Sequence, residues 1–573
     1  MKRICVYLPF LFFILSSFSQ TPAKYWIQFT DKNKSEYSVD RPNEFLSPRT
    51  VEKRKRFNIP VTVEDLPVNK NYIQEVLSLD STMVLFTCSK WLNGITVYAE
   101  EEEILDKIKK LPFVAFAERT ILLKEKEIPC DERFYYNSID NNLNVIGIDT
   151  NTIFSYGKST NQIRINNIHW LHRLGYSGQG IHMMIMDGGF HNVDSIRHFE
   201  ILRKENRLLG ARNFVEPCVD PMRKHSHGTY VLSCIASEVP NELIGSAPNV
   251  FVYLAQTEDS RSENKIEEDN WVAGIEWADS LGCDVLNSSL GYTKFDDPNQ
   301  PRTAADLNGK VSRASQAATI AAKKGIIVCN SAGNAGNDKW KYIGCPADAE
   351  DILAVGGINV KGERAEFSSY GPTADSRIKP DACAVGRATY VANPFGKTLA
   401  ADGTSFSSPL LAGMVSCLWQ AFPEKTTYEI INAIRQSGHQ ATKPDSSLGY
   451  GITDFFKAYN LLLQAPPTYD ASGNPMFEIQ LNTFVYNNSP IIIKINSKVQ
   501  TKCTLQLKLR NGESTEVKEY KIPKGKKVIK IKELPSLGTM DYGFVDLYLK
   551  GEIVNCHYVI GMEKEKKKKE LQE

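Results

Sequence analysis

Residues 181–189 read Ile181-His182-Met183-Met184-Ile185-Met186-Asp187-Gly188-Gly189, an apolar run that ends in an acid and two glycines. A short apolar run of this kind is typical of a strand that is buried on both faces. In open α/β sheets the ligand sites lie beyond the carboxyl ends of the strands, which is where Asp187 stands. Asp187 is therefore a candidate site residue, although an acid that only caps the next turn would give the same pattern.

Short apolar strands recur on both sides of this run and alternate with helices. The periodicity predicts strands at 181–186, 251–255, 284–289, 325–330 and 352–355, and helices at 228–236, 270–281, 312–323, 407–421 and 427–436. Alternating strands and helices predict an α/β fold with a mostly parallel sheet that is flanked by helices on both faces. We assign residues 161–464 to this domain.

Composition restricts the function. The chain has 573 residues, of which 42% are hydrophobic and 24% charged, as in ordinary globular proteins of about three domains. Its 68 Lys+Arg balance 67 Asp+Glu, so no overall charge would hold nucleic acid, and we expect no nucleic-acid partner. The 12 cysteines form no CxxC pair, which argues against a zinc ribbon or a redox motif.

The first residues have the pattern of a cleavable signal peptide. Lys2 and Arg3 precede an apolar run at 4–14, and Ser17 and Ser19 place small residues before a cut at the end of 1–19. An uncleaved anchor is the alternative, but the run is short for a membrane span. We therefore predict a protein that is secreted or located at the cell envelope, with no stable membrane span after cleavage.

Three further segments surround the α/β region. Residues 20–125 combine strands and helices and predict a small α+β, ferredoxin-like domain. Residues 126–160 are polar and without periodicity, which indicates a linker. Residues 465–573 alternate with period two, and Asn511-Gly512 between two such runs predicts a hairpin in a small antiparallel β domain, resembling a sandwich.

A second candidate is the cluster His225-Ser226-His227-Gly228-Thr229, which precedes a predicted helix. His227 stands where a histidine could act as a base, and Gly228 permits a close backbone approach there. A surface histidine pair and a metal-binding His-x-His are the alternatives. No HExxH motif strengthens the metal interpretation, and we predict no metal ligand among these residues.

The third and fourth candidates are a serine and an asparagine. Ser405, in Asp402-Gly403-Thr404-Ser405-Phe406-Ser407-Ser408-Pro409, precedes a long apolar helix whose positive end can stabilise an oxyanion. Asn334, in Asn330-Ser331-Ala332-Gly333-Asn334, follows a predicted strand and could donate its amide N–H to the same oxyanion. A helix cap and a plain turn are the simpler interpretations of the two motifs.

Together, these motifs resemble those of the subtilisin-like serine proteases, or subtilases. Five match in order: Met186-Asp187-Gly188-Gly189, His227-Gly228-Thr229, Asn287-Ser288-Ser289-Leu290-Gly291, Ala332-Gly333-Asn334, and Gly403-Thr404-Ser405 with Pro409. The resemblance implies that Ser405 is the nucleophile, His227 the base and Asp187 its partner, with Asn334 in the oxyanion hole. It also implies that Ser288, Ser289, Leu290 and Gly291 pair with an extended substrate.

The chain departs from the family pattern at three points. Tyr230 follows His-Gly-Thr, Phe406-Ser407 follows Ser405, and a second glycine follows Asp187-Gly188. None of these changes removes a catalytic atom, so they bear on specificity.

The layout resembles subtilases exported by Bacteroidetes-type bacteria, in which residues 20–125 would be an inhibitory prodomain. The resemblance implies processing between about Thr120 and Thr160, with the prodomain as an intramolecular inhibitor. No cofactor is required for the chemistry. Structural calcium is a family expectation for which no ligand set stands out in the sequence.

These observations predict a secreted serine endopeptidase that acts on protein or peptide substrates and is made as an autoprocessed zymogen. One alternative is a catalytically silent subtilase-fold scaffold that binds peptides. Another is an amide or ester hydrolase that acts on small molecules with the same residues.

Overall fold

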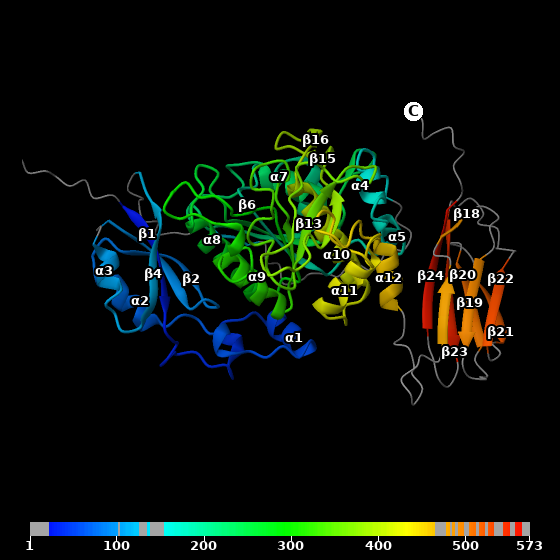
Figure 1. The fold of residues 1–573 in the computed structure, drawn as a ribbon, viewed down its shortest axis with the longest axis horizontal. Coiled ribbons are helices and arrows are strands. Elements are labelled where there is room, and N and C mark those ends of the chain that lie inside the picture. Colours follow the sequence, from blue (N-terminus) through cyan, green and yellow to red (C-terminus); the bar gives the residue numbers. More distant parts are fainter. Residues whose placement is uncertain are drawn as a thin grey trace, which may run out of the picture.

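The computed structural model describes residues 22–100, 103–124, 135–137 and 154–463, together with eight strands of the C-terminal region (Figure 1). The predicted signal peptide and most of the predicted linker lie outside the described residues. Among the described residues, none of the helices combines the length and the apolar composition that a membrane crossing needs.

The central element is an eight-stranded sheet in the order β14-β13-β12-β11-β6-β10-β7-β5. Neighbouring strands from β14 to β7 are parallel, and β5 adds an antiparallel edge, so the predicted mostly parallel sheet is confirmed. The strands are β5 (Tyr135–Asn137), β6 (His182–Asp187), β7 (Leu208–Asn213), β10 (Phe251–Gln256), β11 (Val285–Ser288), β12 (Ile327–Ser331), β13 (Leu353–Ile358) and β14 (Ala382–Val385).

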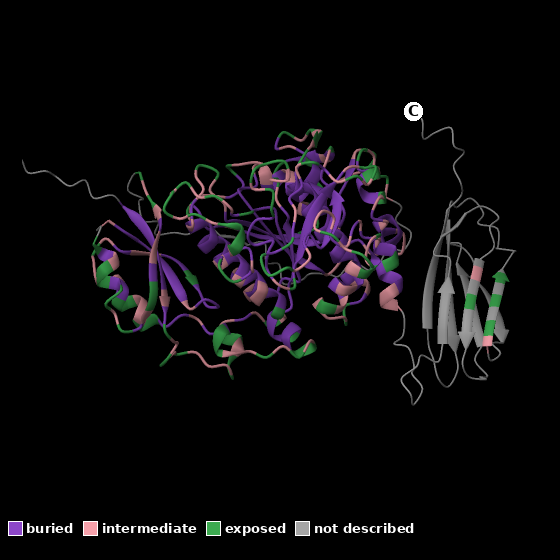
Figure 2. Ribbon diagram, viewed as in Figure 1, coloured by how far each residue is buried: buried purple, intermediate pink, exposed green. Residues whose placement is uncertain are grey.

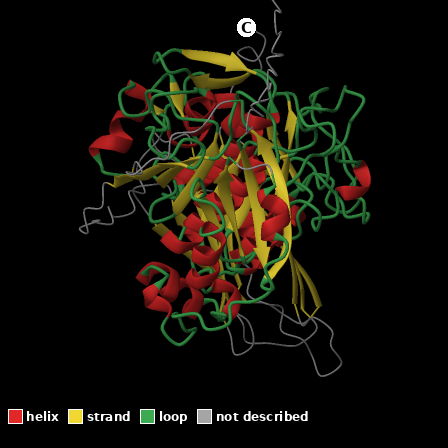
Figure 3. Cartoon of the chain, turned by 90° about the vertical axis from the view of Figure 1, so that its left-hand side faces the viewer, coloured by secondary structure: helices red, strands yellow, loops and turns green. Residues whose placement is uncertain are grey.

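Helices cover both faces of this sheet, as Figure 3 shows. Successive side chains of a strand point to opposite faces, so in β6 Met183 and Ile185 pack with α7 and α10, and Met184 and Met186 pack with α8 and α9. The helices are α4 (Thr160–Arg164), α5 (Ile168–Arg173), α6 (Glu200–Lys204), α7 (His227–Ala236), α8 (Ile266–Leu281), α9 (Arg313–Lys323), α10 (Thr404–Ala421), α11 (Thr427–Ser437) and α12 (Phe455–Leu463). Two short ribbons complete the domain, β8 (Glu238–Val239) with β9 (Leu243–Ile244) and β15 (Thr389–Ala392) with β16 (Thr398–Ala401).

Helix α10 passes through the middle of the domain and is buried from Thr404 to Trp419. Figure 2 shows this region as the most continuously buried part of the molecule. A helix that is apolar all round must be covered on every side, which explains why its sequence lacks an amphipathic stripe. Its N-terminus is therefore held in one position relative to the sheet.

The N-terminal region forms a second, four-stranded antiparallel sheet in the order β2-β3-β1-β4. Its strands are β1 (Ala23–Phe29), β2 (Val84–Ser89), β3 (Gly94–Ala99) and β4 (Val114–Leu122). Helices α2 (Lys70–Leu77) and α3 (Ile104–Ile108) bury Val76, Ile104 and Ile108 against it. The predicted ferredoxin-like arrangement is confirmed, with one addition: helix α1 (Pro48–Arg56) lies apart from this sheet and contacts α8 of the α/β domain.

The C-terminal strands form two sheets, β17-β19-β22 and β18-β24-β23-β20-β21. All their pairings are antiparallel except β18 with β24, and β20 pairs with β21 as the predicted hairpin. The strands are β17 (Phe477–Leu481), β18 (Phe484–Tyr486), β19 (Ile491–Ser497), β20 (Thr504–Arg510), β21 (Thr515–Lys521), β22 (Gly525–Ile531), β23 (Tyr542–Lys550) and β24 (Cys556–Glu563).

Three strands of the large sheet were not expected from the sequence. Strand β7 contains Gly210, Arg212 and Asn213, which break the apolar run, and β14 has only four residues. Strand β5 lies within the predicted linker and has no apolar pattern that would indicate a strand. Its backbone pairing with β7 holds it in place. The helix at the serine begins at Thr404 rather than at residue 407, so Ser405 lies in its first turn.

Candidate active site

Four of the predicted site residues lie along the carboxyl edge of the parallel sheet. Asp187 is the last residue of β6, and Asn334 follows β12. His227 and Ser405 lie in the first turns of α7 and α10, the two helices that pack on the same face of the sheet. The His227 ring lies 6.0 Å from the ring of Phe406, the neighbour of Ser405, so the fold brings these segments together.

Asp187 and His227 form a direct contact. The Nδ1 atom of His227 lies 2.8 Å from Oδ1 of Asp187, whose side chain is fully buried. The Gly188 N–H donates to the same oxygen at 2.7 Å and fixes the carboxylate. Burial opposes the charged imidazolium, but the charge and the hydrogen bond of Asp187 outweigh it and raise the pKa of His227 above its ordinary value.

Gly228 makes this contact possible. A Cβ atom at this position would lie 2.5 Å from the Gly189 carbonyl oxygen and 2.6 Å from the Phe190 ring. The Gly228 N–H donates to that carbonyl at 2.9 Å. The start of α7 therefore lies directly against the loop after β6, which places His227 beside Asp187.

The amide of Asn334 is oriented by Thr404. Both the backbone N–H and the hydroxyl of Thr404 donate to Asn334 Oδ1 at 2.9 Å, and the Gly333 N–H donates to the Thr404 hydroxyl at 3.2 Å. Because Oδ1 accepts these two bonds, the Nδ2 group must point away from Thr404. Gly333 has φ +108°, a conformation that favours glycine and turns the loop back towards α10.

Ser405 lies at the start of α10 with 8% of its surface exposed. Its N–H belongs to the first turn, where helical N–H groups have no acceptor within the helix. Pro409, four residues later, has no N–H to donate to the Ser405 carbonyl. This carbonyl instead accepts a hydrogen bond from the Ser289 hydroxyl at 2.9 Å. The serine helix is thereby tied to the segment that the sequence assigns to substrate pairing.

That segment, residues 288–291, is bonded to the core at some positions and exposed to solvent at another. The Ser288 hydroxyl accepts a bond from the Trp271 indole at 3.0 Å, and the Leu290 carbonyl accepts one from Asn330 at 3.1 Å. Among the described residues, no backbone hydrogen bond joins Ser289 or Gly291 to a neighbouring segment, and Gly291 is exposed. Two of the four residues thus keep their backbone groups available for an extended chain.

A cluster of three carboxylates lies next to Asp187, on the loop that follows β10 and in the first turn of α8. Glu258, Glu263 and Glu267 each place a carboxylate oxygen within 4.8 Å of the others, which is a geometry that could hold a metal ion. Burial, followed by the charges of neighbouring carboxylates, raises the pKa of Glu258 to about 8, of Glu263 to about 7 and of Glu267 to about 10. No motif in the sequence pointed to this cluster, and Thr404, although quoted in a motif, had no role assigned.

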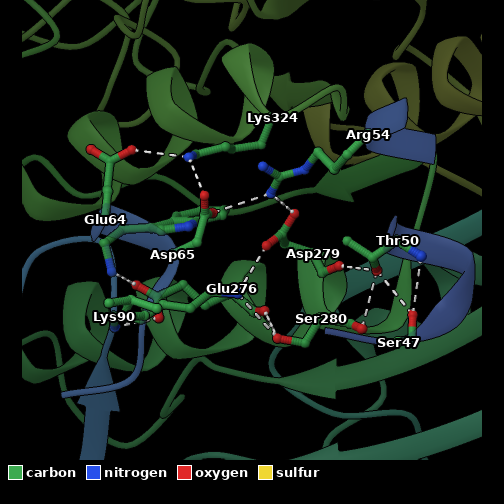
Figure 4. A network of polar contacts seen from close by, with 12 residues as sticks. Ser47, Thr50, Arg54, Glu64, Asp65, Lys90, Glu276, Asp279, Ser280 and Lys324 are labelled. Carbon is green, nitrogen blue, oxygen red and sulfur yellow. Dashed lines mark hydrogen bonds and ion pairs between the residues drawn. The ribbon is translucent and has the colours of Figure 1, made fainter. Parts of the chain in front are cut away.

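The N-terminal region is joined to helix α8 by buried polar contacts (Figure 4). The Glu276 carboxylate accepts bonds from the Ser89 hydroxyl and from the N–H groups of Lys90 and Trp91, at 2.5 to 3.1 Å. Asp279 pairs with Arg54 at 2.7 Å and with Lys90 at 2.9 Å. Burial raises the pKa of Asp279, but the charges of Lys90 and Arg54 outweigh it and hold this pKa well below its usual range.

A second pair of contacts extends this network towards α9. Asp65 lies 3.3 Å from Arg54 and 2.8 Å from Lys324, and all three side chains are buried. The network therefore joins the N-terminal region to two helices that cover the same face of the large sheet.

Two family models match the chain. The subtilase family model matches residues 198–451, which include His227, Asn334 and Ser405, and the model of the peptidase S8 propeptide domain of Bacteroidota matches residues 24–133. Subtilisin from Bacillus pumilus is 30% identical over 286 residues, which cover 49% of this chain and 90% of that protein. Subtilisin DY from Bacillus licheniformis is 28% identical over 279 residues, covering 48% of this chain and 89% of that protein.

A solved structure shows the same fold. The crystal structure of the epidermin leader peptide processing serine protease from Staphylococcus aureus has a TM-score of 0.50 and 17% sequence identity. The match covers 77% of this chain and 100% of that one. With a curated subtilisin matched over nine-tenths of its length and a propeptide model matched ahead of it, the chain belongs to the subtilase family and is a serine endopeptidase with a propeptide domain.

Proposed function

We propose that this protein is a secreted endopeptidase that cleaves peptide bonds with Ser405 as nucleophile, His227 as general base and Asp187 as its partner. The observation that carries the proposal is the 2.8 Å contact between His227 Nδ1 and the buried Asp187 carboxylate, next to helix α10, which holds Ser405 in its first turn. The contact leaves the other ring nitrogen of His227 free for the serine.

The proton route follows from this contact. With Nδ1–H donated to Asp187, the neutral imidazole has its lone pair on Nε2. Nε2 takes the proton of Ser405 as its oxygen attacks the scissile carbonyl, and returns it to the leaving amine. Water then hydrolyses the acyl enzyme by the same route. Asp187 stabilises the imidazolium that forms in both steps.

The oxyanion would be stabilised by two donors from different segments. Asn334 can offer Nδ2–H because Thr404 occupies its Oδ1. Ser405 can offer its own N–H at the positive end of α10. Both donors are fixed before the substrate arrives, so they need no reorganisation as charge develops.

A peptide substrate fits the site better than a small ester. The backbone groups of Ser289 and Gly291, which have no backbone partner in the described part of the chain, could pair with an extended chain by strand addition. The Ser289 hydroxyl also contacts the Ser405 carbonyl, so the pairing segment and the nucleophile form one unit.

The N-terminal region would act as an intramolecular inhibitor of the exported zymogen. It buries Ser89, Lys90 and Trp91 against α8 through the Glu276 and Asp279 carboxylates. The signal-like pattern of residues 1–19 and the match to a Bacteroidota propeptide model support export.

Serine-directed labelling tests the proposal. A fluorescent organophosphonate should label the processed wild type and the control Ser195→Ala, which changes an exposed serine, but not Ser405→Ala. Wild type should also digest casein. Labelling of Ser405→Ala would reject the assigned nucleophile, cleavage of small esters alone would reject the peptidase activity, and absence of both reactions in folded wild type would favour a silent scaffold.

A further inference from the structure

Asn287 is a polar residue in a part of the sheet that is otherwise apolar. It lies on β11 two positions after Val285, so both side chains point to the same face of the sheet, where Val285 packs in the hydrophobic core beside α10. Asn287 is 0% exposed. A buried amide is costly unless its donors and its acceptor are paired, so its hydrogen bonds indicate why an amide occupies this position.

The Asn287 amide connects helix α10 to the substrate-pairing segment. Its Oδ1 accepts a hydrogen bond from the Ser408 hydroxyl at 2.8 Å, and its Nδ2 donates to the Ser289 hydroxyl at 3.3 Å. The Ser289 hydroxyl donates in turn to the Ser405 carbonyl at 2.9 Å. Because Ser408 fixes Oδ1, the amide presents an N–H to Ser289, whose single proton is then directed at Ser405. The four residues form one directional chain of hydrogen bonds.

Ser408 belongs to this chain because its hydroxyl points away from its own helix. Serine hydroxyls within helices commonly donate to a carbonyl one turn earlier. On α10 the hydroxyls of Ser407 and Ser416 bond in this way, both at 3.0 Å. Ser408 is equally buried, but its hydroxyl donates to Asn287. Helix α10 is therefore joined to the end of β11 and the segment after it at two points one turn apart, Ser405 and Ser408.

The chain also replaces the helical hydrogen bond that Pro409 removes. In an uninterrupted helix the Ser405 carbonyl would accept the N–H of residue 409, which proline lacks. The Ser289 hydroxyl supplies a donor in its place. The first turn of α10 therefore takes its position from the segment assigned to substrate pairing, and a rotation of the Ser289 hydroxyl would deprive the Ser405 carbonyl of this donor.

We propose that Asn287 is a positioning residue, which couples the pairing of an extended substrate at residues 289–291 to the nucleophile Ser405. Pairing energy far from the scissile bond raises kcat only if it also places the reacting carbonyl at the nucleophile. The Ser289 hydroxyl keeps the pairing segment and Ser405 at a fixed separation, and Asn287 keeps that hydroxyl directed at Ser405. The inference rests on the proposed roles of Ser405 and of residues 288–291, and Asn287 acts through Ser289 rather than on the substrate.

The test measures how much kcat gains from a longer substrate. Wild type and variants are expressed as the full chain, processed, and titrated with an organophosphonate so that rates refer to active sites. The substrates are a tetrapeptide p-nitroanilide and the p-nitroanilide of its last residue alone, which share a leaving group. Asn287→Asp keeps the shape of the side chain but draws the Ser289 proton to itself, and Ser408→Ala releases the amide. The control Ser416→Ala removes an equally buried hydroxyl of α10.

In wild type and Ser416→Ala, the tetrapeptide should have the higher kcat. Its kcat should fall about 10- to 100-fold in Asn287→Asp and about 2- to 13-fold in Ser408→Ala, while its KM and the rate of the short substrate change little. The loss in Asn287→Asp should grow with pH, because only the ionised form of the introduced carboxyl lacks a proton for Ser289. In a Ser289→Ala background, Ser408→Ala should cause no further loss.

The comparison of the two substrates separates positioning from a general defect. Equal losses on both substrates would overturn the inference, because Asn287 would then serve only the packing of the core. A gain from the longer substrate that survives in both Asn287→Asp and Ser408→Ala would reject the role of Asn287 alone. No gain even in wild type would reject substrate pairing at residues 289–291, and the inference with it. Ser408→Ala leaves Asn287 in place, so it decides the question if Asn287→Asp folds poorly.

Discussion

Thr404 should control catalysis through Asn334 without contacting the substrate. Its N–H and its hydroxyl both donate to Asn334 Oδ1 at 2.9 Å, so they decide which way the amide points. The substitution Thr404→Val removes the hydroxyl and keeps the shape of the side chain and the backbone donor. Thr404→Ser is the matched control because it retains the hydroxyl.

The magnitude follows from the number of bonds lost. One neutral hydrogen bond of the two on Oδ1 disappears, which is worth about 0.5–1.5 kcal/mol and corresponds to about a 2- to 13-fold decrease in kcat. Asn334→Ala removes the oxyanion donor itself and should cost about 10²- to 10³-fold, the loss established for the equivalent donor in subtilisin. KM should change little in either variant, because the interaction is made in the transition state.

A double-mutant cycle provides the decisive assay. Steady-state hydrolysis of a peptide anilide is measured for wild type, Thr404→Val, Asn334→Ala and the double variant. If Thr404 acts only by orienting Asn334, the double variant should be no slower than Asn334→Ala alone. The Gly333 N–H also loses its acceptor in Thr404→Val, so the melting temperature is recorded to keep stability separate from rate.

The reasoning would be refuted if the rate losses of Thr404→Val and Asn334→Ala multiplied in the double variant. Additive free energies would mean that the Thr404 hydroxyl acts on the transition state independently of Asn334. A normal kcat in Thr404→Val would mean that the backbone N–H alone fixes the amide. A Thr404→Ser variant as slow as Thr404→Val would point to packing as the cause.

Two further predictions concern pH and the propeptide. Because His227 must be neutral to accept a proton, kcat/KM should rise with pH through an apparent pKa above 6.5. Asp187→Asn should move this rise to lower pH and reduce kcat/KM by about 10⁴-fold. A rise at the same pH in Asp187→Asn would contradict the coupling between Asp187 and His227. Asp279→Asn removes the buried carboxylate that pairs with Lys90 and leaves Arg54 with Asp65 alone, so it should lower the free energy of unfolding of the unprocessed precursor by about 3–5 kcal/mol in urea denaturation. The control Asp375→Asn, at a partly exposed pair with Arg377, should cost less than about 1 kcal/mol, and equal costs would show that burial is not the cause.

The candidate catalytic residues could be predicted from the sequence because they lie at the start of a helix or at the end of a strand. Asp187, His227 and Ser405 each stand at a strand end or in the first turn of a helix, so their motifs could be placed on a parallel sheet before its order was known. The alternation of strands and helices predicted that sheet because a parallel sheet needs covering helices on both faces. The hairpin between β20 and β21 followed from Asn511-Gly512 for the same kind of local reason.

The rest depends on contacts between distant residues. Arg54 and Asp279 are 225 positions apart, and nothing near either residue indicates that the propeptide region reaches α8 with an additional helix. Strands β7 and β14 were missed because polar residues or short length hide their pattern. The Glu258, Glu263 and Glu267 cluster resembles an ordinary acidic loop until the fold brings the three carboxylates and Tyr292 together.

The most direct test of the central claim compares the intact mass and the activity of wild type with those of Ser405→Ala. The account predicts that wild type loses its propeptide and digests casein, while Ser405→Ala keeps its propeptide and shows no activity. If both proteins are processed alike and only wild type digests casein, Ser405 remains the nucleophile but another protease matures the chain. Digestion of casein by Ser405→Ala, or inactivity of correctly folded wild type freed of its propeptide, would contradict the account.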